Sequence, residues 1–338
     1  MIAICRSMVR CLCCLCCLIP TTVTLWLLAS SAAHADNCVA TMTDVDFGVV
    51  SPIAGSDVTA SGTLTVRCYW TLGTNPLLLP AANVCVNLGV GPGGSTGSPR
   101  YLLNGSNRLS YNLYTDSSYT GAKIWGSTGS TIGARPITAT LLGLLGLGGV
   151  AASTTVYGRI QASSLVGVPT VGNADTVYAA SFAGHGTVQY GFGSVPCTAG
   201  TSSAFSFQAR ATAINNCLIS TSNLTFASGS PITDQRINAP LTVECTANSS
   251  YQIALNGGVS GNPGARTMKN SVTGETLGYR ISATPDGPTW GDGTAGTIVY
   301  SSVGTGGAQN VMMYGIVPSQ RAPAPGDYRD TVTVLLMF

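Results

Sequence analysis

The sequence predicts an all-β protein made of two tandem β-sandwich domains, and three observations support this prediction. Glycine accounts for 42 of the 338 residues and charged residues for only 8%, while helical periodicity is almost absent. Short segments alternate in side-chain character with a period of two and are bounded by Gly, Pro, Asn or Ser, as half-buried strands are. An ordered series of residues also occurs twice along the chain, which indicates two homologous domains.

The first element, residues 1–35, has the pattern of a cleaved secretory signal. Arg6 and Arg10 precede an apolar run from about residue 15 to residue 30, and Ala33-His34-Ala35 provides a small-x-small cleavage site. No second run reaches the roughly 20 apolar residues that a membrane helix needs. We therefore expect a soluble, exported chain that begins at Asp36.

Two domains follow the signal, and we place them at residues 36–200 and 201–338. Nine positions separate Cys38 from Phe47, and the same nine separate Cys217 from Phe226. The later matched pairs are Pro52 and Pro231, Leu64 and Leu241, Cys68 and Cys245, Tyr111 and Tyr279, Trp125 and Trp290, Tyr157 and Tyr314, and Asp175 and Asp330. Domains of about 150 residues are of ordinary size for a β-sandwich.

Four segments illustrate the predicted strands in chain order. These are Thr63–Arg67, Leu109–Tyr114, Phe205–Ala211 and Thr331–Leu335. Around the third of them, Phe205 to Ala213 carries Phe and Ala on one face, at 205, 207, 209 and 211. The pattern leaves open whether this strand completes the first domain or begins the second.

Six cysteines remain after removal of the signal, and an even number in an exported chain predicts disulfides formed in an oxidising compartment such as a periplasm. The repeat favours Cys38 with Cys68 and Cys217 with Cys245, and this leaves Cys85 with Cys197. Spacing alone does not establish the connectivity. A zinc site is disfavoured because the cysteines lack both histidine partners and CxxC spacing.

Charge and motifs argue against several functional classes. Removal of the signal takes two arginines from 15 basic residues and leaves all 13 acidic ones, so the net charge falls to zero and we expect no nucleic-acid partner. His185 is the only histidine that remains. Gly93 to Gly97 matches a GxSxG pattern but lacks a strand-to-helix context, and Asp286 with Asp292 is too sparse for a calcium loop. We expect no enzyme, cofactor or metal.

Residues 217–338 resemble the spore coat protein U domain family, and residues 38–182 repeat the likeness more loosely. The segments that carry the resemblance in the second half are Cys217, Leu224–Phe226, Pro231–Ile232, Leu241–Cys245, Trp290–Gly293, Met313–Gly315 and Gly326–Val334. In the first half they are Cys38, Leu64–Val66, Leu109–Asp116, Val156–Ile160 and Asp175–Val177. The likeness covers nearly the whole mature chain.

Two tandem copies of this domain are similar to the tip adhesin of archaic, Csu-type chaperone-usher pili. The resemblance implies immunoglobulin-like sandwiches, with an N-terminal adhesin domain and a C-terminal pilin domain whose incomplete fold a donor strand completes. The implied partners are a periplasmic pilus chaperone, an outer-membrane usher and a neighbouring pilin subunit. The implied location is the pilus tip on the cell surface, reached by export through the periplasm.

The expected mature N-terminus agrees with a tip position. Only Asp36 and Asn37 precede Cys38, which is too short for a donor strand. We therefore expect the molecule to accept a strand at its second domain and to donate none. The alternative is that Phe205 to Ala213 is an ordinary first strand of the second domain and that no polymer lies behind the short N-terminus.

Three loops of the first domain are rich in Leu and Val where their counterparts in the second domain are polar. They lie within residues 69–80, 141–150 and 165–171. Exposed apolar loops mark binding sites, so we expect them to lie together at one pole and to attach the cell to an apolar abiotic or host surface, with biofilm formation as the result. The residues expected at this surface are Trp70, Leu72, Leu77, Leu78, Leu79, Leu141, Leu142, Leu144, Leu145, Leu147, Leu165, Val166 and Val168.

Three alternatives stay open at this point. The apolar loops can fold inward and enlarge the core of the first domain. The chain can be a structural spore or surface coat protein that uses the same sandwiches for assembly. It can also be a tip lectin that binds a carbohydrate in a pocket near Tyr69 and Trp70.

Overall fold

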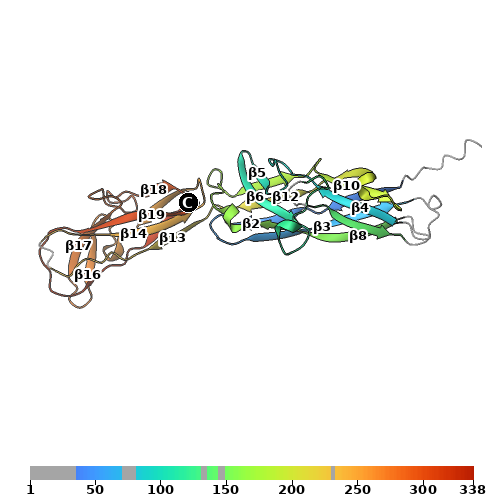
Figure 1. Cartoon of the computed structure of the whole chain (residues 1–338). Coiled ribbons are helices and arrows are strands. Elements are labelled where there is room, and N and C mark those ends of the chain that lie inside the picture. The colour runs from blue at the N-terminus through green and yellow to red at the C-terminus, as the bar shows by residue number, and fades with distance from the viewer. Residues whose placement is uncertain (1–35, 71–80, 131–134, 144–148, 230–232) are drawn as a thin grey trace, which may run out of the picture.

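The computed structural model describes residues 36–70, 81–130, 135–143, 149–229 and 233–338. Within these ranges the chain is almost entirely β-structure, and Figure 1 shows two β domains arranged end to end. This confirms the predicted fold class. No helix in the described ranges has the length and hydropathy needed to cross a bilayer.

Domain one consists of an eight-stranded sheet, in the order β1-β3-β8-β6-β5-β9-β12-β2, and a four-stranded sheet, in the order β11-β10-β4-β7. Its strands are β1 (Asn37–Met42), β2 (Val45–Val50), β3 (Val58–Tyr69), β4 (Ala81–Leu88), β5 (Arg100–Asn104), β6 (Asn107–Tyr114), β7 (Ile137–Leu142), β8 (Gly149–Ile160), β9 (Thr176–Ser181), β10 (Gly186–Phe192), β11 (Thr201–Phe205) and β12 (Gln208–Ala213). A one-turn helix, α1 (Ala162–Leu165), follows β8.

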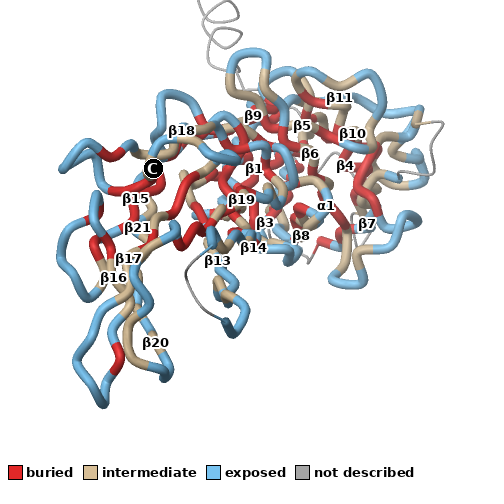
Figure 2. The backbone as a smooth tube through the Cα atoms, turned by 90° about the vertical axis from the view of Figure 1, so that its left-hand side faces the viewer, coloured by how far each residue is buried: buried red, intermediate tan, exposed pale blue. Residues whose placement is uncertain are grey.

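Domain two is smaller, with a six-stranded sheet in the order β13-β14-β19-β17-β16-β20 and a three-stranded sheet in the order β18-β15-β21. Its strands are β13 (Cys217–Thr221), β14 (Gln235–Cys245), β15 (Ser250–Leu255), β16 (Arg266–Asn270), β17 (Thr276–Ser282), β18 (Tyr300–Val303), β19 (Ala308–Val317), β20 (Tyr328–Arg329) and β21 (Val334–Met337). Figure 2 shows that the backbone of both domains is buried inside and exposed along the connecting loops.

The period-two pattern of the sequence determines which side chains enter the core. In β3, Leu64, Val66 and Cys68 are buried, while Arg67 between them is exposed. The predicted strands at 63–67 and 109–114 lie within β3 and β6. The predicted strand at 331–335 is only partly formed, because residues 330–333 lie outside any strand and β21 begins at Val334.

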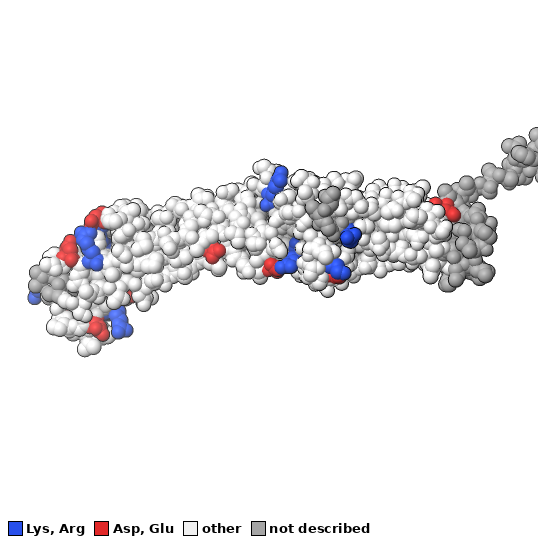
Figure 3. Space-filling view, viewed as in Figure 1, with Lys and Arg blue, Asp and Glu red and all other residues white. Residues whose placement is uncertain are grey.

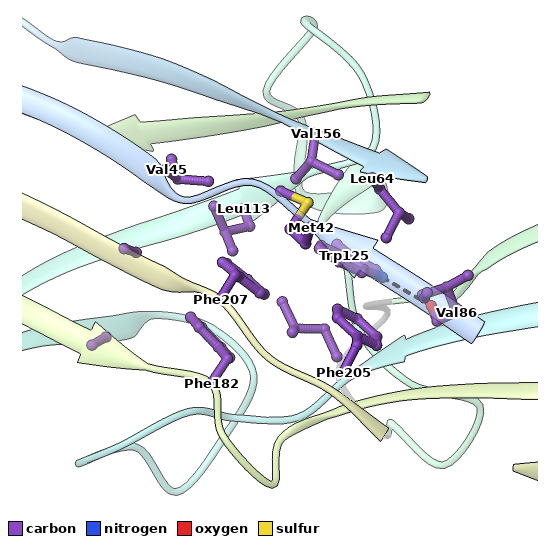
Figure 4. Packing of buried hydrophobic residues seen from close by; sticks show 14 of the residues in the cluster. Met42, Val45, Leu64, Val86, Leu113, Trp125, Val156, Phe182, Phe205 and Phe207 are labelled. Carbon is purple, nitrogen blue, oxygen red and sulfur yellow. Dashed lines mark hydrogen bonds between the residues drawn. The ribbon is translucent and has the colours of Figure 1, made fainter. Parts of the chain in front are cut away.

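Each domain contains a tryptophan that links its two sheets. Trp125 is fully buried and its indole N–H donates to the carbonyl oxygen of Val86, 2.9 Å away (Figure 4). Trp290 is equally buried and donates to the carbonyl oxygen of Ile253 at 2.8 Å. This shared contact confirms that the sequence repeat reflects two copies of one structural unit.

A buried arginine lies beside each tryptophan. Arg100 donates to the carbonyl oxygens of Gly89 and Trp125, at 3.0 and 2.7 Å, and Arg266 donates to those of Leu255 and Trp290, at 3.0 and 2.8 Å. Burial lowers the pKa of both guanidinium groups, for Arg100 to about 10, so both stay charged at neutral pH. Backbone carbonyl dipoles compensate the buried charges.

The three disulfides have the connectivity that the repeat favours. Cys38 bonds to Cys68 and Cys217 bonds to Cys245, each across a pair of adjacent strands. A third disulfide ties Cys85 of β4 to Cys197, in the turn that precedes β11. Each domain is therefore crosslinked at its first strand, and domain one has an additional crosslink in the turn before β11.

Residues 201–213 complete domain one. Strand β11 pairs with β10, and β12 lies between β9, to which it is antiparallel, and β2, to which it is parallel. Phe207 stacks on Phe182 with ring centroids 4.5 Å apart, and both Phe205 and Phe207 stack on Trp125 at 6.2 Å (Figure 4). The predicted boundary at residue 200 is therefore too early. Domain one extends to Ala213 and domain two begins at Cys217.

Direct hydrogen bonds join the two domains. The backbone N–H of Thr170 donates to the carbonyl oxygen of Ala247 at 3.1 Å. The side-chain amide of Asn173 donates to the carbonyl oxygen of Ser250 at 3.0 Å and accepts from its N–H at 2.8 Å. Asn173 adopts a left-handed backbone with φ of 55°, a conformation that asparagine tolerates better than most residues. These contacts fix the orientation of the domains.

We predict that replacement of Phe207 by Ala destabilises domain one by about 3–5 kcal/mol, the usual cost of removing a buried phenylalanine. Urea unfolding followed by tryptophan fluorescence reports on domain one through Trp70 and Trp125. The control Arg210→Ala removes only an exposed ion pair with Asp46 and is expected to cost less than about 1 kcal/mol. A loss of stability confined to domain two would contradict the assignment of β12.

We also predict that Asn173→Ala loosens the two domains without unfolding either, because the paired hydrogen bonds to Ser250 are lost. Small-angle scattering is expected to show a broader distribution of interdomain distances, while the thermal unfolding of each domain changes little. The control Asn104→Ala removes one exposed hydrogen bond within domain one, from the side-chain amide of Asn104 to the carbonyl oxygen of Val177. An unchanged scattering profile for Asn173→Ala means that the junction is held by other contacts.

Candidate functional site

Among its described residues, domain two lacks counterparts of β11 and β12, the two strands that complete domain one. In domain one, β12 fills the space between β2 and β9. The sequence repeat matches Val45 and Phe47 of β2 with Leu224 and Phe226, and β20 pairs with β16 as β9 pairs with β5. Among the described residues of domain two, no strand lies between the segment at 224–228 and the segment at 328–333. The position of β12 is open there.

A groove of about 1000 Å³ occupies this open position. Its walls are formed by residues 221–229 on one side and 325–334 on the other. The apolar side chains that line it and pack on the domain-two core while only partly buried are Leu224, Phe226, Met268, Leu277, Val332 and Val334. A groove with an apolar floor, bordered by residues 224–228 that lie outside any strand, is suited to binding an extended strand.

An open sheet edge lies along β21. In domain one, β10 pairs with β4 on one side and with β11 on the other. In domain two, β21 pairs with β15 and forms the edge of its sheet, and Leu335 and Met337 are 57% and 39% exposed. An exposed edge of this kind is prone to pairing with another chain unless it is covered.

Two of the three predicted apolar loops leave domain one at the same end. Tyr69 pairs with Gly149, and Ala81 pairs with Leu142, so the chain on either side of 71–80 and of 144–148 lies at the end farthest from domain two (Figure 1). We call this end the distal pole. Seven predicted contact residues lie outside the described residues, namely Leu72, Leu77, Leu78, Leu79, Leu144, Leu145 and Leu147.

The described residues of these two loops divide between core and surface. Tyr69 and Leu142 are 43% and 61% exposed at the distal pole. Trp70 and Leu141 are buried and belong to the domain-one core. The prediction that they contact a surface is therefore wrong for these two residues, because their side chains cover the end of the sandwich from within.

The third predicted loop lies at the opposite end of domain one. Leu165 and Val168 are buried in the core, and Thr170 bonds to domain two. Val166 and Val171 are exposed, at the end of domain one that faces the junction. The prediction that all three loops share one pole is therefore wrong for residues 165–171, whose apolar side chains pack near the domain junction.

The sequence analysis missed a different loop at the distal pole, the connection between β10 and β11. The N–H of Gly193 donates to the carbonyl oxygen of Ala81 at 2.9 Å, and the Asn83 side chain donates to the carbonyls of Gly193 and Val195 at 3.1 and 3.0 Å. Val195 is 41% exposed. A comparison of the two sequence repeats could not identify this loop, because no described strand of domain two corresponds to β11.

The surface around the distal pole carries few charges, among them Asp36, next to the Asn37–Tyr69 pair, and the exposed Arg67. None of the four strands β4, β7, β10 and β11 contains an acidic or basic residue. On the face drawn in Figure 3, charged side chains gather on domain two and on the middle and junction side of domain one, and the distal end shows an acidic patch beside the grey atoms. Charge attraction therefore contributes little to binding at this end.

His185 and the GxSxG-like segment Gly93 to Gly97 lie in loops. Within the described ranges, no group of three or more His, Cys, Asp or Glu side chains is arranged to hold a metal. His185 lies in the turn between β9 and β10 with its ring edge-on to Phe182. Gly93 to Gly97 lies in the loop between β4 and β5, without the strand-to-helix turn that a nucleophilic serine needs.

Comparison with known proteins matches one family over most of the chain. The model of the Spore Coat Protein U domain matches residues 24–180 and residues 203–335. No curated protein sequence matches the chain.

Several solved structures are similar in fold at low sequence identity. The complex of chaperone CsuC with tip subunit CsuE from archaic Csu pili of Acinetobacter baumannii is 17% identical with a TM-score of 0.48, covering 89% of this chain and all of that one. The CupB6 tip adhesin of Pseudomonas aeruginosa is 10% identical with a TM-score of 0.39, covering 89% and 94%. A chaperone–tip adhesin complex of CFA/I fimbriae is 10% identical with a TM-score of 0.30, covering 90% and 97%.

The open groove predicts that domain two binds the strand sequence that fills the same position in domain one. A synthetic peptide of residues 201–213 is expected to raise the unfolding temperature of domain two in a concentration-dependent way, because a ligand that binds only the folded state stabilises it. Differential scanning calorimetry of the mature chain with increasing peptide measures this shift.

Two arginine variants test where the peptide binds. Leu224→Arg places a charge in the groove and is expected to abolish the shift, whereas Leu218→Arg changes an exposed residue of β13 and is expected to preserve it. An equal shift in both variants would show that the peptide binds elsewhere.

Proposed function

The chain belongs to the spore coat protein U domain family, and from this premise we propose that it is the tip adhesin of a chaperone-usher pilus. Domain two anchors the molecule to the fibre, and the distal pole of domain one attaches to a surface. The family consists of structural and adhesive proteins, and the chain is not an enzyme.

The single observation that carries the proposal is the contrast between the two domains. Domain one contains its completing strand, β11 with β12, whereas the same position in domain two is an open groove. We propose that a periplasmic chaperone first covers this groove and that the N-terminal strand of a neighbouring pilin subunit replaces it at the outer-membrane usher. Backbone hydrogen bonds and alternate apolar side chains supply the affinity of such an added strand.

The use of the described strands supports the proposed terminal position in the fibre. Strand β1 pairs with β3 along its length and is bonded through Cys38 to Cys68, so it is held inside domain one. Strand β12 is likewise buried between β2 and β9. A subunit that accepts a strand at one end while its described strands are used internally ends a fibre, and its other end is free for attachment.

The distal pole suits attachment to an apolar surface. Tyr69, Leu142 and Val195 are exposed there, on an end with few charges, and leucine-rich sequence at 77–79 and 144–147 connects the strands that end there. Each Leu or Val removed from water contributes about 1.5–3 kcal/mol, and many tips on one cell add avidity. We propose an apolar abiotic or host surface as the target and biofilm formation as the outcome.

Two observations disfavour the lectin alternative. Trp70, which would stack on a sugar ring, is buried in the domain-one core. The side-chain amides on the four-stranded sheet already have hydrogen-bond partners. Asn83 accepts from the hydroxyl of Thr140 and donates to the carbonyl oxygen of Val195. Asn87 accepts from the N–H of Thr128 and donates to the side-chain oxygen of Gln189. Neither set provides a free polar pocket with an aromatic platform.

We predict that the double variant Leu142→Ser and Val195→Ser folds and assembles normally yet attaches several-fold less to polystyrene. Both side chains are exposed at the distal pole, so their loss removes apolar contact area with the surface and leaves the core intact. Counting of attached cells that display the protein, normalised to surface-displayed protein, measures the effect, and free sugars are expected not to compete.

The matched control changes two exposed valines at the other end of domain one. Val166→Ser with Val171→Ser removes a similar exposed apolar area near the junction and is expected to leave attachment unchanged. Equal attachment by the distal variant and the control would overturn the assignment of the distal pole as the adhesive end.

A further inference from the structure

Two carboxylates line the groove of domain two, those of Asp327 and Asp330. The place of Asp330 in the fold differs from its place in the sequence repeat. The repeat matched Asp330 with Asp175. The strand pairings give a different alignment when the two buried arginines, Arg100 and Arg266, are taken as equivalent. Three residues after Arg100, Leu103 pairs with Ala179. Three residues after Arg266, Lys269 pairs with Arg329. Asp330 therefore occupies the position of Ala180.

In domain one this position is apolar and faces the completing strand. Ala180 pairs directly with Ala209 of β12, and both side chains are buried in the core. Two methyl groups therefore meet where β9 and β12 face the interior. In domain two the corresponding side chain is a carboxylate, and it lines the open groove.

The carboxylate is held in a defined orientation. Its Oδ1 accepts from the backbone N–H of Val259 and of Thr331, both at 2.7 Å, and its Oδ2 accepts from the hydroxyl of Tyr279 at 2.5 Å. Gly258 has a φ of 58°, and a Cβ at this position would overlap the carboxylate. Burial raises the pKa of Tyr279, with the hydrogen bond to Asp330 as the second cause, so the phenol retains its proton and donates.

These contacts leave Asp330 with capacity for one more hydrogen bond. A carboxylate offers about four acceptor positions, and the three donors above occupy three of them, with one left on Oδ2. An incoming strand in the register of β12 places an inward-facing side chain against this carboxylate. A large apolar side chain there would cover a charged acceptor without providing a donor, which is unfavourable.

We propose that Asp330 selects the strand that fills the groove, and that the residue of this strand in the position of Ala209 is a serine or threonine. Its hydroxyl donates to Oδ2 of Asp330 and completes the carboxylate's hydrogen bonds. The inference rests on the proposed function of the groove and specifies the chemistry of its partner. The partner strand is thus apolar at its other inward positions and carries a short hydroxyl side chain at this one.

The test compares isosteric peptides. Fluorescein-labelled peptides of residues 201–213 that carry Ala209→Thr or Ala209→Val differ by one hydroxyl group. Fluorescence anisotropy with the full mature chain is expected to give a Kd for the threonine peptide about tenfold lower than for the valine peptide, as for other hydrogen bonds to a charged group. Equal affinity, or tighter binding of the valine peptide, would overturn the proposal.

Protein variants assign the preference to the carboxylate. Asp330→Ala is expected to bring the ratio of the two affinities close to one, and Asp330→Asn, which keeps the shape of the side chain, is expected to reduce it. The control Asp286→Ala changes a carboxylate that lies outside the groove lining and is 59% exposed, and it is expected to keep the ratio. A tenfold ratio that persists in both Asp330 variants contradicts the selection by Asp330.

The outcome also separates this inference from the proposed function. If both peptides bind equally well and Leu224→Arg blocks both, the groove accepts a strand but Asp330 does not select it. If neither peptide binds at concentrations up to the millimolar range, the assignment of the groove as a strand acceptor fails, and the selection by Asp330 fails with it.

Discussion

The structure depends on the need of a β-sandwich to cover every inner strand position. A missing strand leaves backbone N–H and C=O groups unpaired and core side chains exposed to water, and both are unfavourable. Domain one meets this requirement with its own β11 and β12, whose phenylalanines stack on Trp125. Domain two has the same tryptophan and the same buried arginine, but its corresponding position is a groove. The same β-sandwich therefore occurs twice, once closed by its own strands in domain one and once with an open groove in domain two.

The two copies also use one pole of the fold for different purposes. In domain one this pole is distal, with Tyr69 and Leu142 exposed. In domain two the corresponding loop, residues 246–250, contacts domain one through Ala247 and Ser250. The polar character of the domain-two loop therefore has a reason of its own, since it provides hydrogen bonds at the junction. The loops of the two domains therefore differ because the domain-two loop lies at the junction, whereas the domain-one loops lie at the distal pole.

Much of this organisation could be predicted from the sequence. The repeat of Cys, Phe and Trp residues gave the two domains and the disulfide pairs, because each sets a fixed contact within one sandwich. The domain boundary could not be found, since Phe205 and Phe207 alternate as they would in a strand of either domain. The place of residues 165–171 was missed because apolar residues suit both an exposed loop and a buried junction. Asp330 was matched with the wrong residue of domain one because the alignment followed a short Asp-Thr-Val sequence, whereas the strand pairing that places it at the position of Ala180 is visible only in the fold.

The central claim is that domain one is closed by its own strand while domain two is open, and amide hydrogen exchange of the mature chain without any partner tests it directly. The account predicts slow exchange in β9 and β12, where backbone bonds lie in the interior of a sheet, and fast exchange at residues 224–228, which lie outside any strand and border the open position. Exchange in this segment as slow as in β9 would mean that domain two is already closed, and would contradict the account.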